Sequence, residues 1–215
     1  MSRFGIIFVS LIIFLTGCTH TEYKPYEDVD GLSSHFTRTV HFTLNPDLEE
    51  SPPNCVVVFK LNPNRYSVFM AQMERVLLRH LSERFFRIVG GEERDLKAAK
   101  LAFDLTLPID RKNLSGNLGC DSFMEFHVLQ PNHTYLFVWS KLEIGLEARL
   151  YRQADGVELW RARHVANRSD GGFSISPIGL AVSAYKANDL SLDRDAIESI
   201  SDDLVRRVLS SLPGI

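Results

Sequence analysis

The sequence predicts an α+β domain with a mixed sheet, a long carboxy-terminal hairpin and helices packed on one face. Three observations lead to this class. Residues 136–150 alternate between apolar and polar side chains, and residues 157–166 return as a second such segment after a short turn. Residues 55–59 form a β-branched run typical of a strand buried on both faces. Residues 66–81 and 192–212 carry apolar residues three and four positions apart, which favours amphipathic helices.

The composition is that of a folded protein. The chain has 215 residues, of which 45% are hydrophobic and 24% are charged. At about 100–200 residues per domain, this length fits one domain with an extension. The chain has 24 Lys and Arg against 27 Asp and Glu, so its net charge is −3. Because nucleic-acid binding usually shows as a clearly basic chain or patch, we expect no nucleic-acid partner.

The first 18 residues have the pattern of an export signal. Arg3 precedes an uncharged apolar run at 4–15, which is too short to span a bilayer. The run ends in Leu15-Thr16-Gly17-Cys18, which resembles the lipobox of bacterial lipoproteins. The resemblance implies that residues 1–17 are a signal peptide and that Cys18 carries acyl chains after cleavage. The alternative is a plain signal anchor in which the cysteine has no role.

The residues after the lipidation site predict where the domain lies. Thr19, in place of Asp, follows the sorting rule for the outer membrane, with the protein facing the periplasm; exposure at the cell surface is the alternative. Residues 18–34 are polar and lack apolar periodicity, so we expect a lipidated tether. Residues 35–215 are then a single α+β periplasmic domain.

In the first half of the domain, strands are predicted from alternation or β-branched runs, and helices from spacings of three and four. The predicted elements are a half-buried strand at 35–44, a proline-containing loop at 45–54, a buried strand at 55–59, a helix at 66–81, a strand at 85–89, a polar helix at 92–100 and a strand at 101–107. Residues 109–134 contain Gly116, Gly119 and Pro131 and are predicted to be a long irregular loop.

The second half is predicted as a hairpin followed by two helices. A strand at 136–150 reaches a turn at 152–156 and returns at 157–166. A polar loop follows at 167–172. Pro177 suits the first position of a helix at 177–187. The last amphipathic helix ends before Pro213 and Gly214.

The hairpin resembles that of small bacterial surface lipoproteins related to the TolB amino-terminal domain. The similarity rests on the strand Leu142-Glu-Ile-Gly-Leu-Glu-Ala-Arg-Leu-Tyr151, the return Val157-Glu-Leu-Trp160 and the small-residue segment Ile178-Gly-Leu-Ala-Val-Ser-Ala184. This group includes the meningococcal vaccine-candidate lipoprotein and, more distantly, the curli-secretion and Pel-polysaccharide lipoproteins. The resemblance implies a TolB-like fold and a non-enzymatic envelope role, sometimes within a ring-shaped assembly.

Export also changes the interpretation of the three cysteines. Cys18 is taken by lipid, which leaves Cys55 and Cys120 in an oxidising compartment where a disulfide persists. The alternative is two buried thiols in separate places, because pairing needs a geometry that spacing does not show. Two cysteines are too few for a structural zinc site on their own.

No motif of the common catalytic classes is present. The sequence lacks His-Glu-x-x-His, Gly-x-Ser-x-Gly, a P-loop and a dinucleotide-binding glycine pattern, so we expect no enzyme and no cofactor. His35 and His41 share a strand face, but strand histidines are commoner than metal sites, and we expect no metal. Four acids are interpreted as solvated loop groups: Asp104, Asp110, Asp121 and Glu125.

Three segments are candidates for contact with a partner. An aromatic end of the long strand is formed by Tyr135, Phe137 and Trp139. The predicted helix 177–187 is rich in small residues, among them Gly179 and Ala184, which permit close approach. This indicates either a helix packed closely on the sheet or a surface for self-association or membrane contact. The basic run 161–164 with Arg168 has two interpretations, contact with anionic envelope groups or the solvated face of a strand.

Two functions follow from these features. The first is a non-enzymatic structural or accessory component of an envelope assembly or export system, held to the membrane by acyl chains on Cys18 and bound to envelope proteins or to itself. The second is a binder of envelope lipid or polysaccharide that uses the aromatic residues and the 109–134 segment. An envelope hydrolase comes third.

Overall fold

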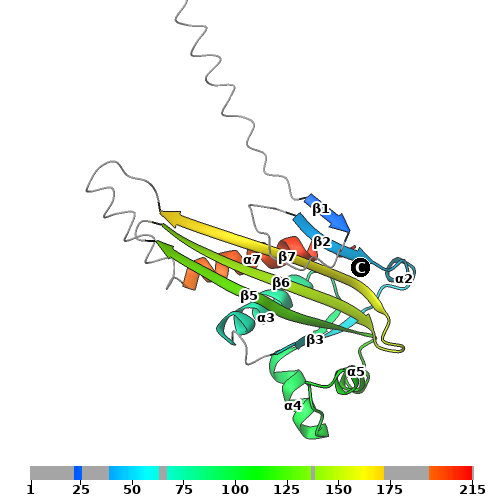
Figure 1. The fold of residues 1–215 in the computed structure, drawn as a ribbon. Coiled ribbons are helices and arrows are strands. Elements are labelled where there is room, and N and C mark those ends of the chain that lie inside the picture. Colours follow the sequence, from blue (N-terminus) through cyan, green and yellow to red (C-terminus); the bar gives the residue numbers. More distant parts are fainter. Residues whose placement is uncertain (1–21, 26–38, 63–66, 137–138, 172–193, 215) are drawn as a thin grey trace, which may run out of the picture.

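A computed structural model describes residues 22–25, 39–62, 67–136, 139–171 and 194–214 (Figure 1). The sheet contains strands β1 (Glu22–Pro25), β2 (Thr39–Leu44), β3 (Cys55–Lys60), β4 (Arg87–Val89), β5 (Ser122–Leu136), β6 (Trp139–Arg152) and β7 (Glu158–Gly171). The helices are α2 (Asp47–Glu50), α3 (Ser67–Leu81), α4 (Gly91–Leu101), α5 (Pro108–Asn117) and α7 (Arg194–Leu209).

The strands form one mixed sheet in the order β1-β2-β7-β6-β5-β3-β4. Strands β5, β6 and β7 are an antiparallel meander, whereas β3 runs parallel to both β4 and β5. Strand β2 pairs antiparallel with β7, and β1 adds parallel to β2 at the edge. The predicted α+β class, with a mixed sheet and a long hairpin, is confirmed.

The main core lies between one face of the sheet and helices α3 and α7 (Figure 1). Helix α3 buries the apolar side of its 3.6-residue period there, as predicted. These two helices contribute Met70, Met73, Val76, Leu77 and Leu81 from α3, and Ile200, Leu204, Val205, Val208 and Leu209 from α7. Trp160 of β7 is 1% exposed and its Nε1 donates to the Ser211 Oγ, 3.2 Å away. This tryptophan is therefore a residue of the main core.

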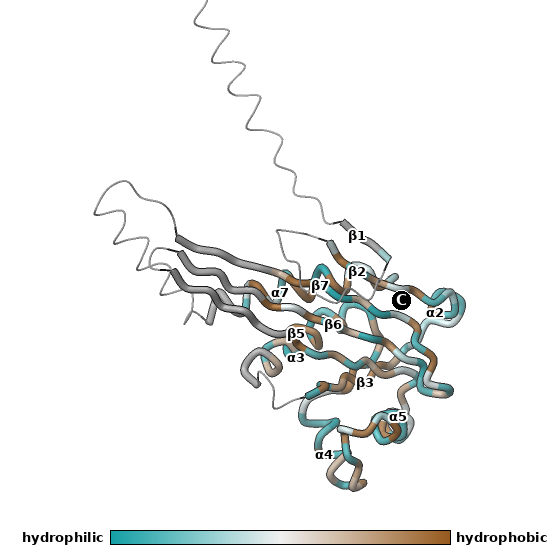
Figure 2. Tube along the Cα trace, in the orientation of Figure 1, coloured by the Kyte–Doolittle hydropathy of each residue, from teal (hydrophilic) through white to brown (hydrophobic). Residues whose placement is uncertain are grey.

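A second, smaller core lies on the opposite face, at the β4 edge. Here Val57 and Phe59 of β3 pack with Ala98 of α4 and Leu114 of α5. Both faces of β3 are thus covered, which explains its continuous apolar sequence. Along β6 and β7 hydrophobic and hydrophilic residues alternate, because only one face of these strands meets a helix layer (Figure 2).

The region 101–134 differs most from the prediction. No strand forms at 101–107, because α4 ends at Leu101, the C-cap residue Ala102 adopts the left-handed conformation (φ 55°), and a turn follows. The Asp104 carboxylate accepts hydrogen bonds from the Thr106 N–H and hydroxyl, which fixes this turn. The predicted loop 109–134 is wrong as well: Pro108 begins α5, and β5 occupies most of the remainder.

Smaller differences affect the other elements. Helix α2 lies within the predicted loop 45–54, and β7 continues through the predicted loop to Gly171. The strand predicted at 136–150 is divided between two strands, since β5 ends at Leu136 and β6 begins at Trp139. Part of the predicted tether forms β1 at the sheet edge. The predicted helix 177–187 lies outside the described residues.

Candidate functional site

The meander has a face of its own that we call the open face: the side of β7, β6 and β5 opposite α3 and α7. Among the described residues, α4 and α5 cover this side of the sheet only near β4, β3 and the start of β5 (Figure 1). Charged side chains follow one another across the strands here. The register places Glu125 opposite Arg149 and Arg149 opposite Arg161, and in the next row His127 opposite Glu147 and Glu147 opposite Arg163.

Glu147 is the centre of this arrangement, and its side chain is only 5% exposed. Its Oε1 accepts from Arg149 Nε at 2.8 Å and Arg149 Nη2 at 2.6 Å. The same oxygen accepts from Arg161 Nε at 3.1 Å and Nη2 at 3.0 Å. His127 Nε2 lies 3.9 Å from Oε2. One buried carboxylate therefore holds two guanidinium groups in fixed positions. We call His127, Glu147, Arg149, Arg161 and Arg163 the Glu147 cluster.

The electrostatics keep this carboxylate ionised. Burial opposes its charge, but the hydrogen bond from Arg149 and attraction to Arg149, His127 and Arg161 outweigh burial and hold the pKa of Glu147 below its usual value. Burial also lowers the pKa of His127; the attraction of Glu147 opposes this shift, and repulsion from Arg149, Arg163 and Arg161 adds to it. The cluster thus carries one negative charge against three arginines.

The cations are the outer part of the cluster. The side chains of Arg149 and Arg161 are 32% and 20% exposed, against 5% for Glu147. A partner approaching the open face therefore meets guanidinium groups. Guanidinium is planar and forms bidentate hydrogen bonds with carboxylate and phosphate groups, so this face is suited to an anionic partner.

A second feature is a cavity of about 860 Å³ at the carboxyl end of β3. Lys60, Arg94, Asp95, Asp104 and Arg111 are among its lining residues. The two arginines are themselves buried and paired. Arg94 Nη1 lies 2.7 Å from Glu74 and 2.6 Å from the Val58 carbonyl, and Arg111 Nε lies 2.6 Å from Glu125. Since each guanidinium already faces a carboxylate, the cavity wall has little surplus charge.

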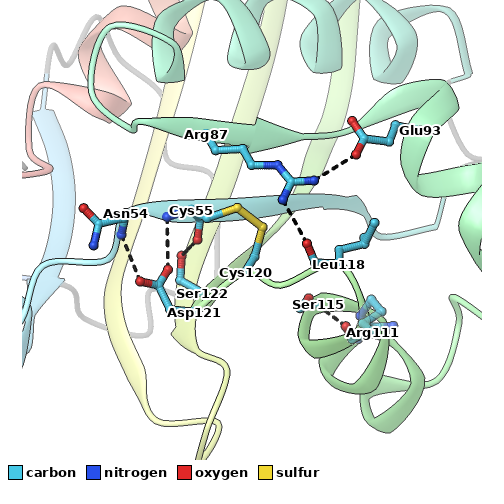
Figure 3. The surroundings of a disulfide bond; sticks show 10 residues. All are labelled: Asn54, Cys55, Arg87, Glu93, Arg111, Ser115, Leu118, Cys120, Asp121 and Ser122. Carbon is cyan, nitrogen blue, oxygen red and sulfur yellow. Dashed lines mark hydrogen bonds and ion pairs between the residues drawn. A yellow bond between two sulfur atoms is a disulfide. The ribbon is translucent and has the colours of Figure 1, made fainter.

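The start of β3 is tied to the start of β5 (Figure 3). Cys55 and Cys120 are joined as a disulfide, with their Cα atoms 4.8 Å apart. Beside it, the Asp121 carboxylate accepts from the backbone N–H groups of Asn54 and Cys55, both at 3.0 Å. The Ser122 hydroxyl donates to the Cys55 carbonyl at 2.8 Å. Asp121 is therefore a structural group and not a free loop acid.

The other sequence-predicted residues are placed as follows. Tyr135 and Trp139 lie at the ends of adjacent strands, where Leu136 pairs with Trp139 and Tyr135 with Ser140. Glu125 is buried in β5 against Arg111, and Asp110 accepts from the Asp104 N–H at 2.9 Å, so neither is a free acid. Four predicted site residues lie outside the described part: Cys18, Phe137, Gly179 and Ala184.

Sequence reasoning missed the buried pairs of Arg94 and Arg111. It singled out the basic run 161–164, but gave no role to Glu147 beyond the solvated side of a strand. The signal available was the cross-strand combination of one acid with several arginines at even spacings. Within the described segments, no group of three or more His, Cys, Asp or Glu is suited to a metal ion, and no helix is long and apolar enough to cross a bilayer.

Comparison with known proteins gives similar folds only. No family model and no curated protein matches the chain. It is similar to a variant of the PelC dodecamer from Paraburkholderia phytofirmans, with 14% identity, a TM-score of 0.48, and coverage of 82% of this chain and 99% of that one. It is also similar to the lipoprotein GNA1162 from Neisseria meningitidis, with 20% identity, a TM-score of 0.44, and coverage of 66% and 100%.

A third similar structure is the LpoB carboxy-terminal domain from Salmonella enterica, with 10% identity, a TM-score of 0.34, and coverage of 53% of this chain and 82% of that domain. The hairpin predicted a likeness to the Pel and meningococcal lipoproteins, and both are among these structures. All three TM-scores are below 0.5.

Proposed function

We propose that this chain is a non-enzymatic, lipid-anchored accessory component of a bacterial envelope assembly, and that it binds an anionic segment of a partner protein, or of a second copy, through the Glu147 cluster. The observation that carries the proposal is the shared pairing of Arg149 and Arg161 with the buried Glu147. It fixes the two cations on a sheet face that the described helices leave open. The lipid anchor rests on the lipobox-like sequence at Cys18.

Rigid cations support binding because little side-chain entropy is lost on contact. A mobile surface arginine loses rotamer freedom when it binds, whereas Arg149 and Arg161 are already held at 2.6–3.1 Å from one oxygen atom. Arg163 lies beside them and makes no ion pair with any residue in the described part of the chain. A carboxylate or phosphate on the partner would complete the charge balance of the cluster.

Crosslinking of the lipoprotein in intact cells, followed by detergent extraction and mass analysis, tests this function. We expect a discrete crosslinked species. Its yield should fall when the salt concentration during crosslinking is raised, since exposed charges are screened. Arg163→Glu removes a cation from the cluster and places a second acid opposite Glu147, and it should reduce that species by about tenfold or more. Arg206→Glu is the matched control, because Arg206 is exposed on α7 and pairs only locally with Asp203.

Two results would contradict the proposal. One is a monomer that co-purifies with lipid or glycan and gives no crosslinked species. The other is an equal loss for Arg163→Glu and Arg206→Glu, which would mean that no specific face is used. The anchor is tested separately: Cys18→Ser should release the protein from membrane fractions and abolish labelling by palmitate.

The alternative, a binder of envelope lipid or polysaccharide, is favoured by the cavity at the end of β3. Its volume of about 860 Å³ is adequate for a small ligand, and Asn62, Asp95, Asp104 and Thr106 offer polar groups at its wall. Under this alternative, Thr106→Trp would block the cavity and remove bound glycan or lipid, while Arg163→Glu would have no effect.

A further inference from the structure

The amino-terminal strand brings the lipidation site close to the sheet. Strand β1 pairs in parallel with β2, with Glu22 opposite Thr39 and Pro25 opposite Phe42. Tyr23 supports this position: its hydroxyl is 2.5 Å from the Ser210 Oγ, and its ring lies edge-on to Phe42 with the centroids 6.1 Å apart. The sheet therefore begins at residue 22, well inside the segment that the sequence predicts as a tether.

This position limits how far the acyl chains can lie from the domain. Only four residue steps separate Cys18 from Glu22. At about 3.3–3.6 Å per residue, the Cys18 Cα lies no more than about 14 Å from the sheet edge, whatever path the intervening residues follow. A flexible tether over residues 18–34 would have allowed the domain to stand well away from the bilayer, and the pairing of β1 removes that freedom.

The same end of the sheet carries the tip of the β5–β6 hairpin. Strand β2 pairs with β7 over His41 and Arg163, and from there β7 continues to Gly171, which pairs with Trp139. The eight steps from 163 to 171 cover about 27 Å at 3.3–3.4 Å each. Because β2 runs antiparallel to β7, the amino-terminal end of β1 points in the same direction as this tip (Figure 1).

The two features lie within one small footprint. Glu22 is level with Thr39, about 7 Å beyond His41, so the tip extends roughly 20 Å past Glu22. Strand β1 is three strand spacings from β6, which is about 14 Å sideways. A bilayer that holds the acyl chains of Cys18 is thus within reach of the hairpin tip when the long strands stand upright on the membrane.

The tip has the composition of a membrane interface. Strand β5 ends in Tyr135 and Leu136, and β6 begins with Trp139. The two residues between them in sequence are Phe and Val, so the sequence from 135 to 139 contains none of the Asn, Asp and Gly residues that usually connect hairpins. Trp and Tyr concentrate at the boundary between hydrocarbon and water, where their rings combine apolar and polar groups.

We propose that the β5–β6 hairpin tip, with Tyr135, Leu136 and Trp139, enters the surface of the bilayer that holds the Cys18 lipid, giving the domain a second membrane contact and a fixed orientation. The inference rests on the lipid anchor of the proposed function. It is independent of the Glu147 cluster and of any partner bound there. Upright strands would leave the open face pointing along the membrane, accessible to a neighbouring protein.

The fluorescence of the lipoprotein in vesicles tests this contact, because the chain has only two tryptophans, and Trp160 is 1% exposed in the core. The purified lipidated protein is reconstituted into phosphatidylethanolamine and phosphatidylglycerol vesicles with and without brominated acyl chains. Bromine quenches tryptophan only at close range. We expect brominated vesicles to remove about half of the emission, and Trp139→Phe to abolish this quenching while the protein stays bound.

A tryptophan at the far end of the sheet is the matched control. Phe86 is 95% exposed and precedes β4, which is level with the start of β3 and hence at the end opposite the tip. In the Trp139→Phe background, Phe86→Trp should be unquenched.

Vesicle flotation in the same samples separates the two proposals. Flotation without quenching of Trp139 overturns the membrane contact and leaves the lipid anchor standing. A lipobox protein that fails to float overturns the anchor and, with it, this inference. Equal quenching of the tryptophans at positions 139 and 86 would also overturn the inference, because the domain would then have no fixed orientation.

Discussion

The Glu74 carboxylate of α3 and the Arg94 guanidinium of α4 meet 2.7 Å apart, with side-chain exposures of 9% and 2%. Lys60 of β3 reaches the other Glu74 oxygen at 2.8 Å, so one acid links the two helices and the strand. Burial opposes the charge of Arg94, but hydrogen bonds and attraction from Asp95 and Glu74 outweigh it and raise the pKa of Arg94. Arg94 also lines the cavity at the end of β3.

Removing Glu74 should therefore destabilise the domain strongly. Glu74→Gln removes the buried counter-charge that Arg94 and Lys60 share and leaves Arg94 only the half-exposed Asp95, and we expect the free energy of unfolding to fall by about 3 kcal/mol in a urea titration followed by circular dichroism. Glu93→Gln breaks an exposed pair with Arg87 and should cost less than about 1 kcal/mol. Equal effects of the two variants would contradict this role for Glu74.

The link between Cys55 and Cys120 closes a loop with a sequence separation of 65 residues. Constraining the unfolded chain over such a loop is worth about 2–4 kcal/mol. We expect Cys55→Ala/Cys120→Ala to lower the free energy of unfolding by that amount, and thiol titration of the exported wild type to find no free cysteine. Two reactive thiols in the exported protein would contradict the prediction.

Periodicity was sufficient to predict α3, the hairpin and α7, because each buries one face against the main core and keeps a regular apolar spacing. Strand β3 was predicted from its continuous apolar run, because both of its faces are covered. Strand β5 was missed for a specific reason. Met124, Phe126 and Val128 do alternate, but Phe123 on the other face is buried as well, under α5. The pattern of a strand with two covered faces was obscured by the glycines and the proline around it.

The candidate site required tertiary structure. Arg94 and Glu74 are separated by 20 residues and lie on different helices, and nothing in either helix pattern indicates that they meet. The arginines of β7 were visible in sequence as a basic run. That Glu147 is buried beneath them depends on the register of β6 with β7, which places Glu147 opposite Arg163. Register between strands is set by packing and turns, and spacing within one strand does not determine it.

His164 predicts how stability depends on pH. Burial lowers the pKa of His164 below its ordinary 6.5, although its Nδ1 is 2.7 Å from the Thr39 carbonyl, and Arg207 and His41 add to the lowering while Asp203 opposes it. Below pH 6.5 the unfolded chain binds a proton that the folded chain excludes. The stabilising contribution is therefore complete above pH 6.5 and is lost as the pH falls towards the lowered pKa.

A melting series between pH 7.5 and 5.0 measures this effect. We expect the melting temperature of the wild type to fall with acidification. The melting temperature of His164→Asn should fall less, because Asn keeps a donor for the Thr39 carbonyl but does not titrate. Parallel curves for the two proteins would contradict the assignment. The pKa of His127 is lowered as well, and this residue is present in both proteins. The melting temperature of His164→Asn should therefore still fall with acidification, but less steeply than that of the wild type.

Gly145 tests how closely β5 and β6 are packed. A Cβ at this position would lie 2.7 Å from the Leu129 Cβ and 2.8 Å from its Cδ1, and Leu129 is the residue directly opposite in the register. Because the Leu129 Cβ cannot move without its backbone, Gly145→Ala should lower the free energy of unfolding by roughly 1–3 kcal/mol. Gly214→Ala, which meets open space, is the control and should be neutral. In a double-mutant cycle, Leu129→Gly should reduce the cost of Gly145→Ala, whereas additive effects would mean that the close approach to Leu129 is not its cause.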